Sequence, residues 1–320
     1  MNVDKPKISV IIPIYKAEKY IERCAVSLFE QSLSSIEYIF VDDCSPDNSV
    51  EVLYSVIKRY PRRLRWVKVL KNNQNSGVGY SRARGVDVAR GEYIIHCDPD
   101  DWVERNAYED LYEAAITEGA DMVICGMVEE IEGKAVKRTS EVTDLRNDVL
   151  IHNLFTAKLH GSLCNKLINR EFVANHNIRF VEGLNMCEDL TFCFQVLKSG
   201  AKVSFLNECF YHYDIRINPN SISSKKSKTH ADQYFKLLDA YDKLFNNKQN
   251  VDYYNAFTTA AYWAFMHDIF STNEYVKFHF SHINALIRSE LGVKEKIATI
   301  MSAIGLKSIM YRMYIKFRKN

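Results

Sequence analysis

The chain has 320 residues, of which 47% are hydrophobic and 26% are charged, and its formal net charge is +2 at pH 7. These values are typical of a globular protein that buries a sizeable core in one large domain or two smaller ones. So small a net charge argues against nucleic acid as a partner, and any basic patch must be local.

The cysteines and the apolar runs indicate a cytoplasmic protein. Eight cysteines occur without a C-x-x-C pair, and several lie inside apolar runs, where a thiol packs as a small hydrophobic group. Reduced thiols therefore fit better than a disulfide framework or a zinc site. The run before Pro13 is too short for a signal peptide, and no segment approaches the roughly 18 uninterrupted apolar residues of a membrane span.

Strands and helices alternate at the start of the chain. Apolar, β-branched runs predict buried strands at residues 8–15 and 36–43, and further strands are predicted at residues 64–70 and 92–98. Apolar residues at helical spacing predict helices at residues 18–33, 49–60 and 79–90. This order builds a parallel sheet covered by helices, which binds ligands at the C-terminal ends of its strands.

The rest of the chain is less regular. Residues 106–120 favour a helix and residues 121–131 a strand, and the polar stretch 132–148 predicts a loop excursion. From Lys225 onward the sequence has long helical patterns rich in Tyr and Phe, with no proline. We expect an appended helical region there.

Polar clusters follow two of the predicted strands. In "VDDCSPDNS", Asp42 or Asp43 could accept the N–H of a pyrimidine base, while the residues from Ser45 to Asn48 are also typical of a helix start. In "CDPDD", carboxylates two residues apart could present hard oxygen ligands to one Mg²⁺ or Mn²⁺. The same pattern occurs in ordinary turns, so by itself it leaves both interpretations open.

Five segments, in this order and spacing, resemble the family-2 glycosyltransferases of the GT-A fold. They are "ISVIIPIYKAEKYIERCAVSLFEQSL", "EYIFVDDCSPDNS", "NQNSGVGYSRARG", "GEYIIHCDPDD" and "CEDLTF". The resemblance implies a Rossmann-like α/β domain with a mixed central sheet at residues 1–224, followed by a helical region at 225–320. Within the first domain it implies a nucleotide-binding half at 1–104 and an acceptor-side half at 105–224.

The resemblance also implies a nucleotide-sugar pocket drawn from the first four segments. Its residues are Pro13, Tyr15, Glu18, Asp42, Asp43, Asn75, Gly77, Arg82 and Asp98. An alternative interpretation of Tyr15 is an aromatic residue at the start of a helix. Ala83 stands where the family usually has Asn, so a contact sometimes made by that side chain is absent.

For the "DPDD" loop, the resemblance implies that Asp100 holds a Mg²⁺ or Mn²⁺ ion bridging both phosphates. Asp98 would contribute to the same ion or hold the ribose or a water. The third acid, Asp101, could instead cap the helix predicted after it.

The pair Glu188 and Asp189 opens an apolar helical pattern, where first-turn acids are favourably placed against the helix dipole. The resemblance implies a catalytic pair instead. Asp189 would be the general base that deprotonates the acceptor hydroxyl, and like-charge repulsion from Glu188 would raise its proton affinity. We favour catalysis over capping because of the order of the motifs.

On the acceptor or phosphate side, the resemblance places residues from two further segments. They are Asn165, Lys166, His212, Arg216, Asn220 and Ser221. A lone Lys is usually a solvated surface group, and a His between two tyrosines is more often packed and hydrogen-bonded. Those alternatives for Lys166 and His212 stay open.

The last segment, residues 306–320, places apolar side chains on one helical face and five Lys or Arg residues on the remainder, with no acid. Such a helix could dock on this protein or on the partner of a homodimer. It could equally lie on the anionic inner face of a cell membrane.

We therefore predict a metal-dependent, inverting glycosyltransferase. It would move a sugar from a UDP-linked donor to a saccharide or lipid-linked saccharide acceptor in bacterial cell-surface polysaccharide synthesis. A sugar-phosphate nucleotidyltransferase is expected to have a glycine-rich loop after the first strand. The segment "PIYKAEKY" at that place has no glycine, which argues against this class of enzyme. The presence of both Asp100 and Asp189 argues against a catalytically silent sugar-nucleotide-binding or scaffold protein.

Overall fold

The computed structural model describes residues 5–131, 134–139, 142–214, 229–245 and 250–266, with a few positions between 288 and 297. The chain divides into two compact units, one of residues 1–148 and 161–221 and one of residues 149–160 and 222–320. Residues 149–160, predicted from the sequence to belong to the first domain, are grouped with the second unit in the structure.

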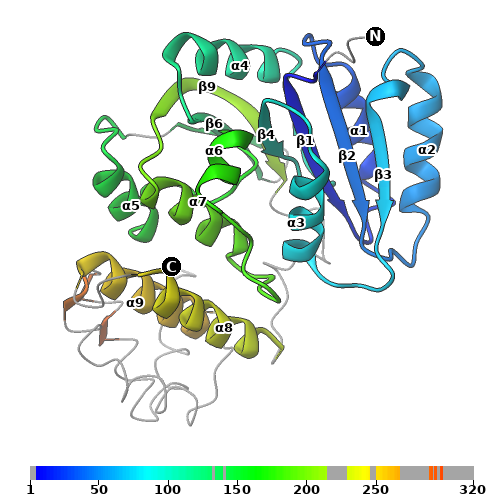
Figure 1. The fold of residues 1–320 in the computed structure, drawn as a ribbon. Helices are drawn as coiled ribbons and strands as arrows, with labels where there is room; N and C mark the ends of the chain where they lie inside the picture. Colours follow the sequence, from blue (N-terminus) through cyan, green and yellow to red (C-terminus); the bar gives the residue numbers. More distant parts are fainter. Residues whose placement is uncertain are drawn as a thin grey trace. The chain divides into compact units, whose positions relative to one another are not determined.

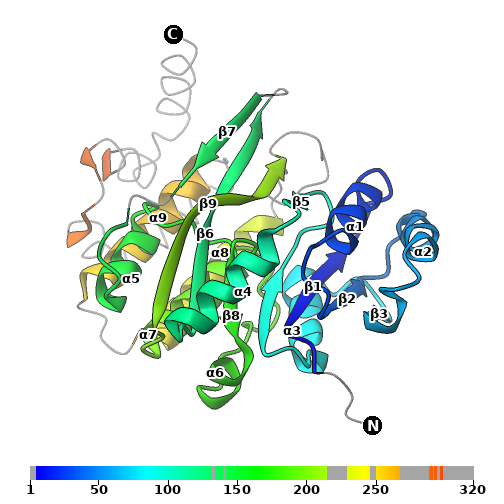
Figure 2. The ribbon, with the colours of Figure 1, turned by 90° about the horizontal axis from the view of Figure 1, so that it is seen from above.

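The first unit is built on one mixed sheet (Figure 1). Its strands are β1 (Ile8–Ile14), β2 (Ile36–Asp42), β3 (Val67–Lys71), β4 (Tyr93–His96), β5 (Trp102–Val103), β6 (Met122–Ile131), β7 (Lys134–Arg138), β8 (Lys166–Asn169) and β9 (Val203–Asp214). The strand order is β3-β2-β1-β4-β8-β6-β9-β5, with β7 paired to β6 (Figure 2). The first four strands in this order are parallel, and β8 is antiparallel to both of its neighbours.

Helices cover both faces of this sheet. They are α1 (Ile21–Phe29), α2 (Ser49–Arg59), α3 (Val78–Val88), α4 (Ala107–Glu118), α6 (Arg170–Asn175) and α7 (Glu188–Lys198). Alternate β1 residues such as Val10 and Ile12 pack in one core with α1, α2 and α4. Ile11 points to the other face, where a Cβ at Gly85 of α3 would overlap its side chain. Because β1 is covered on both sides, all of its residues are buried and all but Ser9 are apolar.

The second unit contains α5 (Asn147–Phe155), α8 (Thr229–Leu244) and α9 (Val251–Met266), of which α5 begins in the first unit. Aromatic rings fill its core: the centroid of Phe155 lies 5.6 Å from that of Tyr241 and 5.4 Å from that of Phe245. In the part of the chain that the structure describes, no helix is both long and apolar enough to cross a membrane.

The predicted α/β fold with a mixed sheet and a helical C-terminal region is confirmed, and three local predictions are wrong. Residues 134–138 form β7 instead of a loop, because they pair with the end of β6. The predicted strand at 64–70 begins with a 3₁₀ turn at Leu64–Trp66. Asp101 caps no helix, because Trp102 and Val103 pair with β9 and α4 begins only at Ala107.

Candidate active site

The parallel strands β1, β2 and β4 end at the same edge of the sheet, and most of the predicted pocket residues lie there. Pro13 is inside β1, and Tyr15 follows it with 40% of its surface exposed. The Glu18 carboxylate accepts hydrogen bonds from the backbone and side-chain nitrogens of Asn48, at 3.3 and 3.1 Å. Glu18 therefore ties the loop after β1 to the start of α2.

Asp42 ends β2, Asp43 follows it, and both are almost fully buried. Asp42 accepts the Ser45 backbone N–H at 2.8 Å. The Asp43 carboxylate accepts the backbone N–H groups of Ser76 and Gly77, both at 2.8 Å, and the Asn72 amide at 2.7 Å. Asp43 thus shapes the loop that leads into α3, a role that the motif alone did not reveal.

That loop is tightly packed at Gly77. Its φ of 91° is in the region that favours glycine, and a Cβ there would overlap the Asn185 side chain. The Asn185 oxygen also accepts the Gly79 N–H at 3.0 Å. Asn75, two residues earlier, is exposed. The start of α3 is therefore fastened to the segment that precedes α7.

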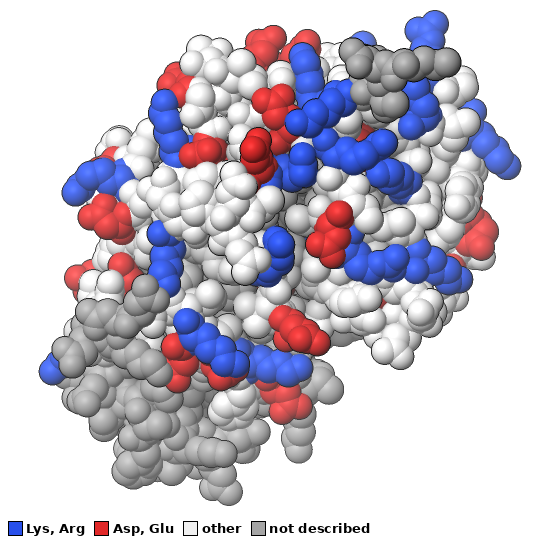
Figure 3. All heavy atoms as spheres, viewed as in Figure 1, with Lys and Arg blue, Asp and Glu red and all other residues white. Residues whose placement is uncertain are grey.

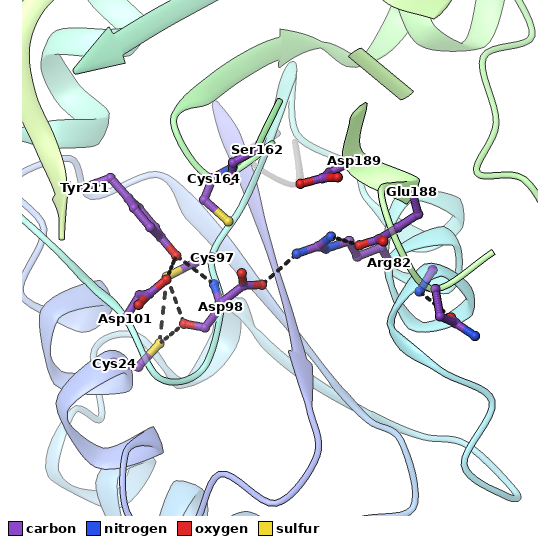
Figure 4. A network of polar contacts seen from close by, with 12 residues as sticks. Cys24, Arg82, Cys97, Asp98, Asp101, Ser162, Cys164, Glu188, Asp189 and Tyr211 are labelled. Carbon is purple, nitrogen blue, oxygen red and sulfur yellow. Dashed lines mark hydrogen bonds and ion pairs between the residues drawn. The ribbon is translucent and has the colours of Figure 1, made fainter. Parts of the chain in front are cut away.

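Arg82 of α3 joins the two sides of the site, as Figure 4 shows. Its guanidinium is buried, donates to Asp98 Oδ1 at 2.7 Å and donates to the Glu188 carboxylate. Burial alone would lower the pKa of Arg82, but the charges of Asp98 and Glu188 outweigh it and raise that pKa above its ordinary value. A permanently charged arginine thus bridges residues that follow β4 and open α7.

Glu188 and Asp189 occupy different surroundings at the first turn of α7. Glu188 is buried, and burial raises its pKa to about 7, with Arg82 opposing the shift and Asp189 adding to it. Asp189 is half-buried, and its carboxylate accepts the backbone N–H of Leu190, the next residue of α7, at 2.7 Å. Figure 4 shows it beside Arg82 and Glu188. The predicted role of Glu188 is an effect on Asp189, whereas in the structure its carboxylate pairs with Arg82.

The "DPDD" loop places Asp98 and Asp101 in different environments. Asp98 is partly exposed and paired with Arg82. Asp101 is buried, and accepts the Tyr211 hydroxyl at 2.5 Å and the Asp214 N–H at 3.0 Å. Burial, followed by repulsion from Asp100 and Asp98, raises the pKa of Asp101 well above its ordinary value. Asp101 therefore anchors the loop to β9.

A second contact to β9 passes through Arg23 of α1. Its guanidinium donates to the Asp100 carbonyl at 2.8 Å and to Asp214 at 3.2 Å, and lies 3.7 Å from the centre of the Trp102 ring. Sequence reasoning missed Arg23, Tyr211 and Asp214, because no motif spans residues so far apart in the chain.

Asp98 and Asp100 suit a divalent cation. Both are hard oxygen donors on one tight loop, and Mg²⁺ usually takes one or two carboxylates together with waters and substrate phosphates. Within the described residues, no group of three or more His, Cys, Asp or Glu side chains could hold a metal ion. An ion held by Asp98 and Asp100 would have to take most of its ligands from substrate and water, and the metal role of these two carboxylates stays a prediction.

Lys166 and Asn165 lie in the interior, so the alternative of a solvated lysine is wrong. The Lys166 amine is fully buried and donates to the Ser162 carbonyl at 2.6 Å and to the Asn165 side chain at 2.8 Å. Burial lowers its pKa, and the charge of Asp189 is among the groups that oppose this. Lys166 is thus close enough to Asp189 to interact with its charge.

His212 is packed and hydrogen-bonded. Its ring nitrogens lie 3.0 Å from a Glu130 oxygen and 2.9 Å from a Glu104 oxygen, and the ring stacks on Trp102. These contacts favour a structural role over phosphate binding. Arg216, Asn220, Ser221 and the helix predicted at 306–320 lie outside the described residues.

Comparisons with known proteins show relatives of this chain. Residues 9–176 match the family model described as "Glycosyl transferase family 2". The putative glycosyltransferase EpsH of Bacillus subtilis is 32% identical over 232 residues, which are 71% of this chain and 65% of EpsH. The match thus spans less than two thirds of that relative.

Two solved structures share the fold. A crystal structure of S. aureus TarS in complex with UDP-GlcNAc superposes with a TM-score of 0.71 and 20% identity, over 97% of this chain and 92% of that one. The mannosyltransferase PcManGT from Pyrobaculum calidifontis, in complex with GDP-Man and Mn²⁺, gives a TM-score of 0.57 at 13% identity, over 97% and 88%. The motifs, the site and the family match together establish that this chain is a GT-A member of glycosyl transferase family 2.

Proposed function

We propose that this protein is a metal-dependent, inverting glycosyltransferase that moves a sugar from a UDP-linked donor to a saccharide or lipid-linked saccharide acceptor in cell-surface polysaccharide synthesis. The Arg82 bridge carries the proposal. It ties Asp98, on the loop suited to the donor phosphates, to Glu188, the neighbour of Asp189.

In the reaction, Asp189 takes the proton of an acceptor hydroxyl as that oxygen attacks the anomeric carbon. The bond to the nucleoside diphosphate breaks on the opposite face of the sugar, so one displacement inverts the configuration and needs no enzyme nucleophile. Arg82 keeps Glu188 paired and so holds the first turn of α7. Asp98 and Asp100 would hold a Mg²⁺ or Mn²⁺ ion, which neutralises charge on the departing diphosphate when bound.

The comparisons support parts of this proposal. The TarS complex contains UDP-GlcNAc, and the more distant PcManGT complex contains GDP-Man with Mn²⁺. The higher structural similarity to TarS favours a UDP-linked donor. The acceptor class and the inversion rest on the family resemblance of the motifs.

The test is a thermal-shift screen of UDP-, GDP- and dTDP-sugars, with Mn²⁺ and with chelator. A ligand that binds only the folded state raises apparent stability by about 2.7 kcal/mol at a concentration of 100 times its Kd. We expect a UDP-sugar to raise the melting temperature in Mn²⁺ and much less in chelator. The best donor is then incubated with saccharide acceptors. If no nucleotide sugar shifts the melting temperature, the donor assignment is wrong, and binding without any transfer would favour a silent sugar-nucleotide-binding protein.

A further inference from the structure

The turn between α2 and β3 exposes a basic and apolar surface that the proposed reaction does not use. We call residues 58–66 the basic turn. Because α2 starts at the edge where the parallel strands end and runs back, this turn lies near the N-terminal end of β3. It is therefore at the opposite edge of the sheet from Asp42 and Asp98.

The basic turn lies in a stretch with no acidic residue. Between Glu51 and Asp87 the chain has nine Lys and Arg residues and no Asp or Glu. Lys58, Arg62 and Arg65 are exposed and form no ion pair within the described part of the chain. Figure 3 shows Lys and Arg side chains over α2 and the start of β3, at the upper right. Glu22 pairs with Arg59 and Glu30 accepts the Tyr60 hydroxyl, so Lys58, Arg62 and Arg65 are the bases that favour a negatively charged partner.

Arg63 makes the basic turn rigid. Its guanidinium donates to four backbone carbonyls, those of Phe29 at 3.1 Å, Gln31 at 2.5 Å, Leu33 at 2.9 Å and Ser34 at 2.9 Å. Carbonyl groups carry no net charge, so the positive charge of Arg63 still contributes to the local field. The turn therefore needs no reordering to bind a partner, which lowers the entropic cost of binding.

An apolar side chain, that of Leu64, is exposed among the arginines of the basic turn. Leu64 is 58% exposed and lies between Arg63 and Arg65. Tyr54, 49% exposed, lies one helical turn before Lys58 on α2. Beside Leu64 is an open pocket of about 610 Å³ lined by Ser34, Pro61, Arg62, Arg63, Arg65 and Trp66. Arginines around such a pocket suit the phosphate of a lipid headgroup.

We propose that the basic turn docks this protein on an anionic lipid bilayer, with Arg62 and Arg65 on headgroup phosphates and Leu64 in the interfacial layer. A soluble polyanion would use the charges but gain nothing from an exposed leucine, whereas a bilayer interface uses both. Docking at this edge leaves the opposite, donor-binding edge of the sheet open. The proposal goes beyond the glycosyl transfer, since the basic turn lies at the opposite edge of the sheet from Asp42 and Asp98, which are predicted to bind the donor.

The test is co-sedimentation of the full chain with vesicles of phosphatidylcholine, with and without phosphatidylglycerol. One Lys or Arg near an anionic surface contributes about fivefold in partitioning, so R62Q/R65Q should bind anionic vesicles roughly 25-fold more weakly. Leu64→Ser should weaken binding roughly tenfold. The matched control is K134Q/K137Q, which removes two exposed bases of β7 and should stay within about twofold of wild type.

Melting temperature and UDP affinity, measured without lipid, check that every variant is folded. They also separate this proposal from the proposed function, because UDP binding needs no vesicles. Binding of R62Q/R65Q equal to that of wild type would overturn the proposal. The proposal would also be wrong if Leu64→Ser bound vesicles as tightly as wild type and soluble inorganic polyphosphate displaced the protein fully from the vesicles. The site would then recognise a free polyanion.

Discussion

Arg82 is the residue whose loss should disturb this site most. Arg82→Met keeps a long side chain but removes the charge that pairs with Asp98 and Glu188. Breaking a buried ion pair typically costs about 3–5 kcal/mol, because the remaining charge is left without a partner. The Asp98 side chain is 30% exposed and can be rehydrated, so we expect the lower end, about 3 kcal/mol.

For a unit of about 200 residues, a loss of that size lowers the melting temperature by roughly 10 °C. Differential scanning fluorimetry measures it, with Arg84→Met as the matched control. Arg84 is on the same helix, but its acceptors within the described residues are neutral, namely the Lys71 carbonyl and the Asn72 side chain. Its loss should therefore cost about 1 kcal/mol.

A double-mutant cycle separates the charge from the shape of Arg82. Arg82→Met leaves the Glu188 carboxylate without its partner, and R82M/E188Q replaces that carboxylate by a neutral amide. The double variant should therefore recover part of the lost stability, which gives a favourable coupling energy between the two positions. UDP affinity and transfer rate are measured on the same preparations. If Arg82→Met melts no lower than Arg84→Met, the buried bridge does not hold these segments together.

Three further predictions concern the acids of the site. Because burial raises the pKa of Glu188 from 4.5 to about 7, the folded state holds its proton to higher pH than the unfolded state, so the stability of the wild type should fall as pH rises between those values. Glu188→Gln should flatten that dependence in melting curves, and parallel curves would contradict the shift. Asp189→Asn should lower the transfer rate by ~10²–10⁴ with UDP affinity retained, and a near-normal rate would exclude the general base. Asp100→Ala should remove most of the difference in UDP affinity between Mn²⁺ and chelator by calorimetry, and a wild-type difference would leave Asp100 without a metal role.

The sequence was sufficient for features that depend on neighbouring residues. The alternation of apolar strands and amphipathic helices over residues 8–98 predicted the parallel half of the sheet, because strand and helix periodicity are local properties. The same pattern put Asp42, Asp43 and Asp98 at one edge, since parallel strands that share a sheet end together. Motif order then indicated the family and singled out Asp100 and Asp189.

Only the tertiary structure decided how the acids of the site differ. Glu188 and Arg82 are 106 residues apart in the sequence. No local sequence pattern predicts that the two side chains are in contact or that both are buried. Asp98 pairs with arginine, Asp101 binds a tyrosine hydroxyl from β9, and Lys166 is buried, and none of these surroundings is indicated by the neighbouring sequence. Burial and long-range pairing set the protonation and position of such groups, and both arise only when distant segments pack together.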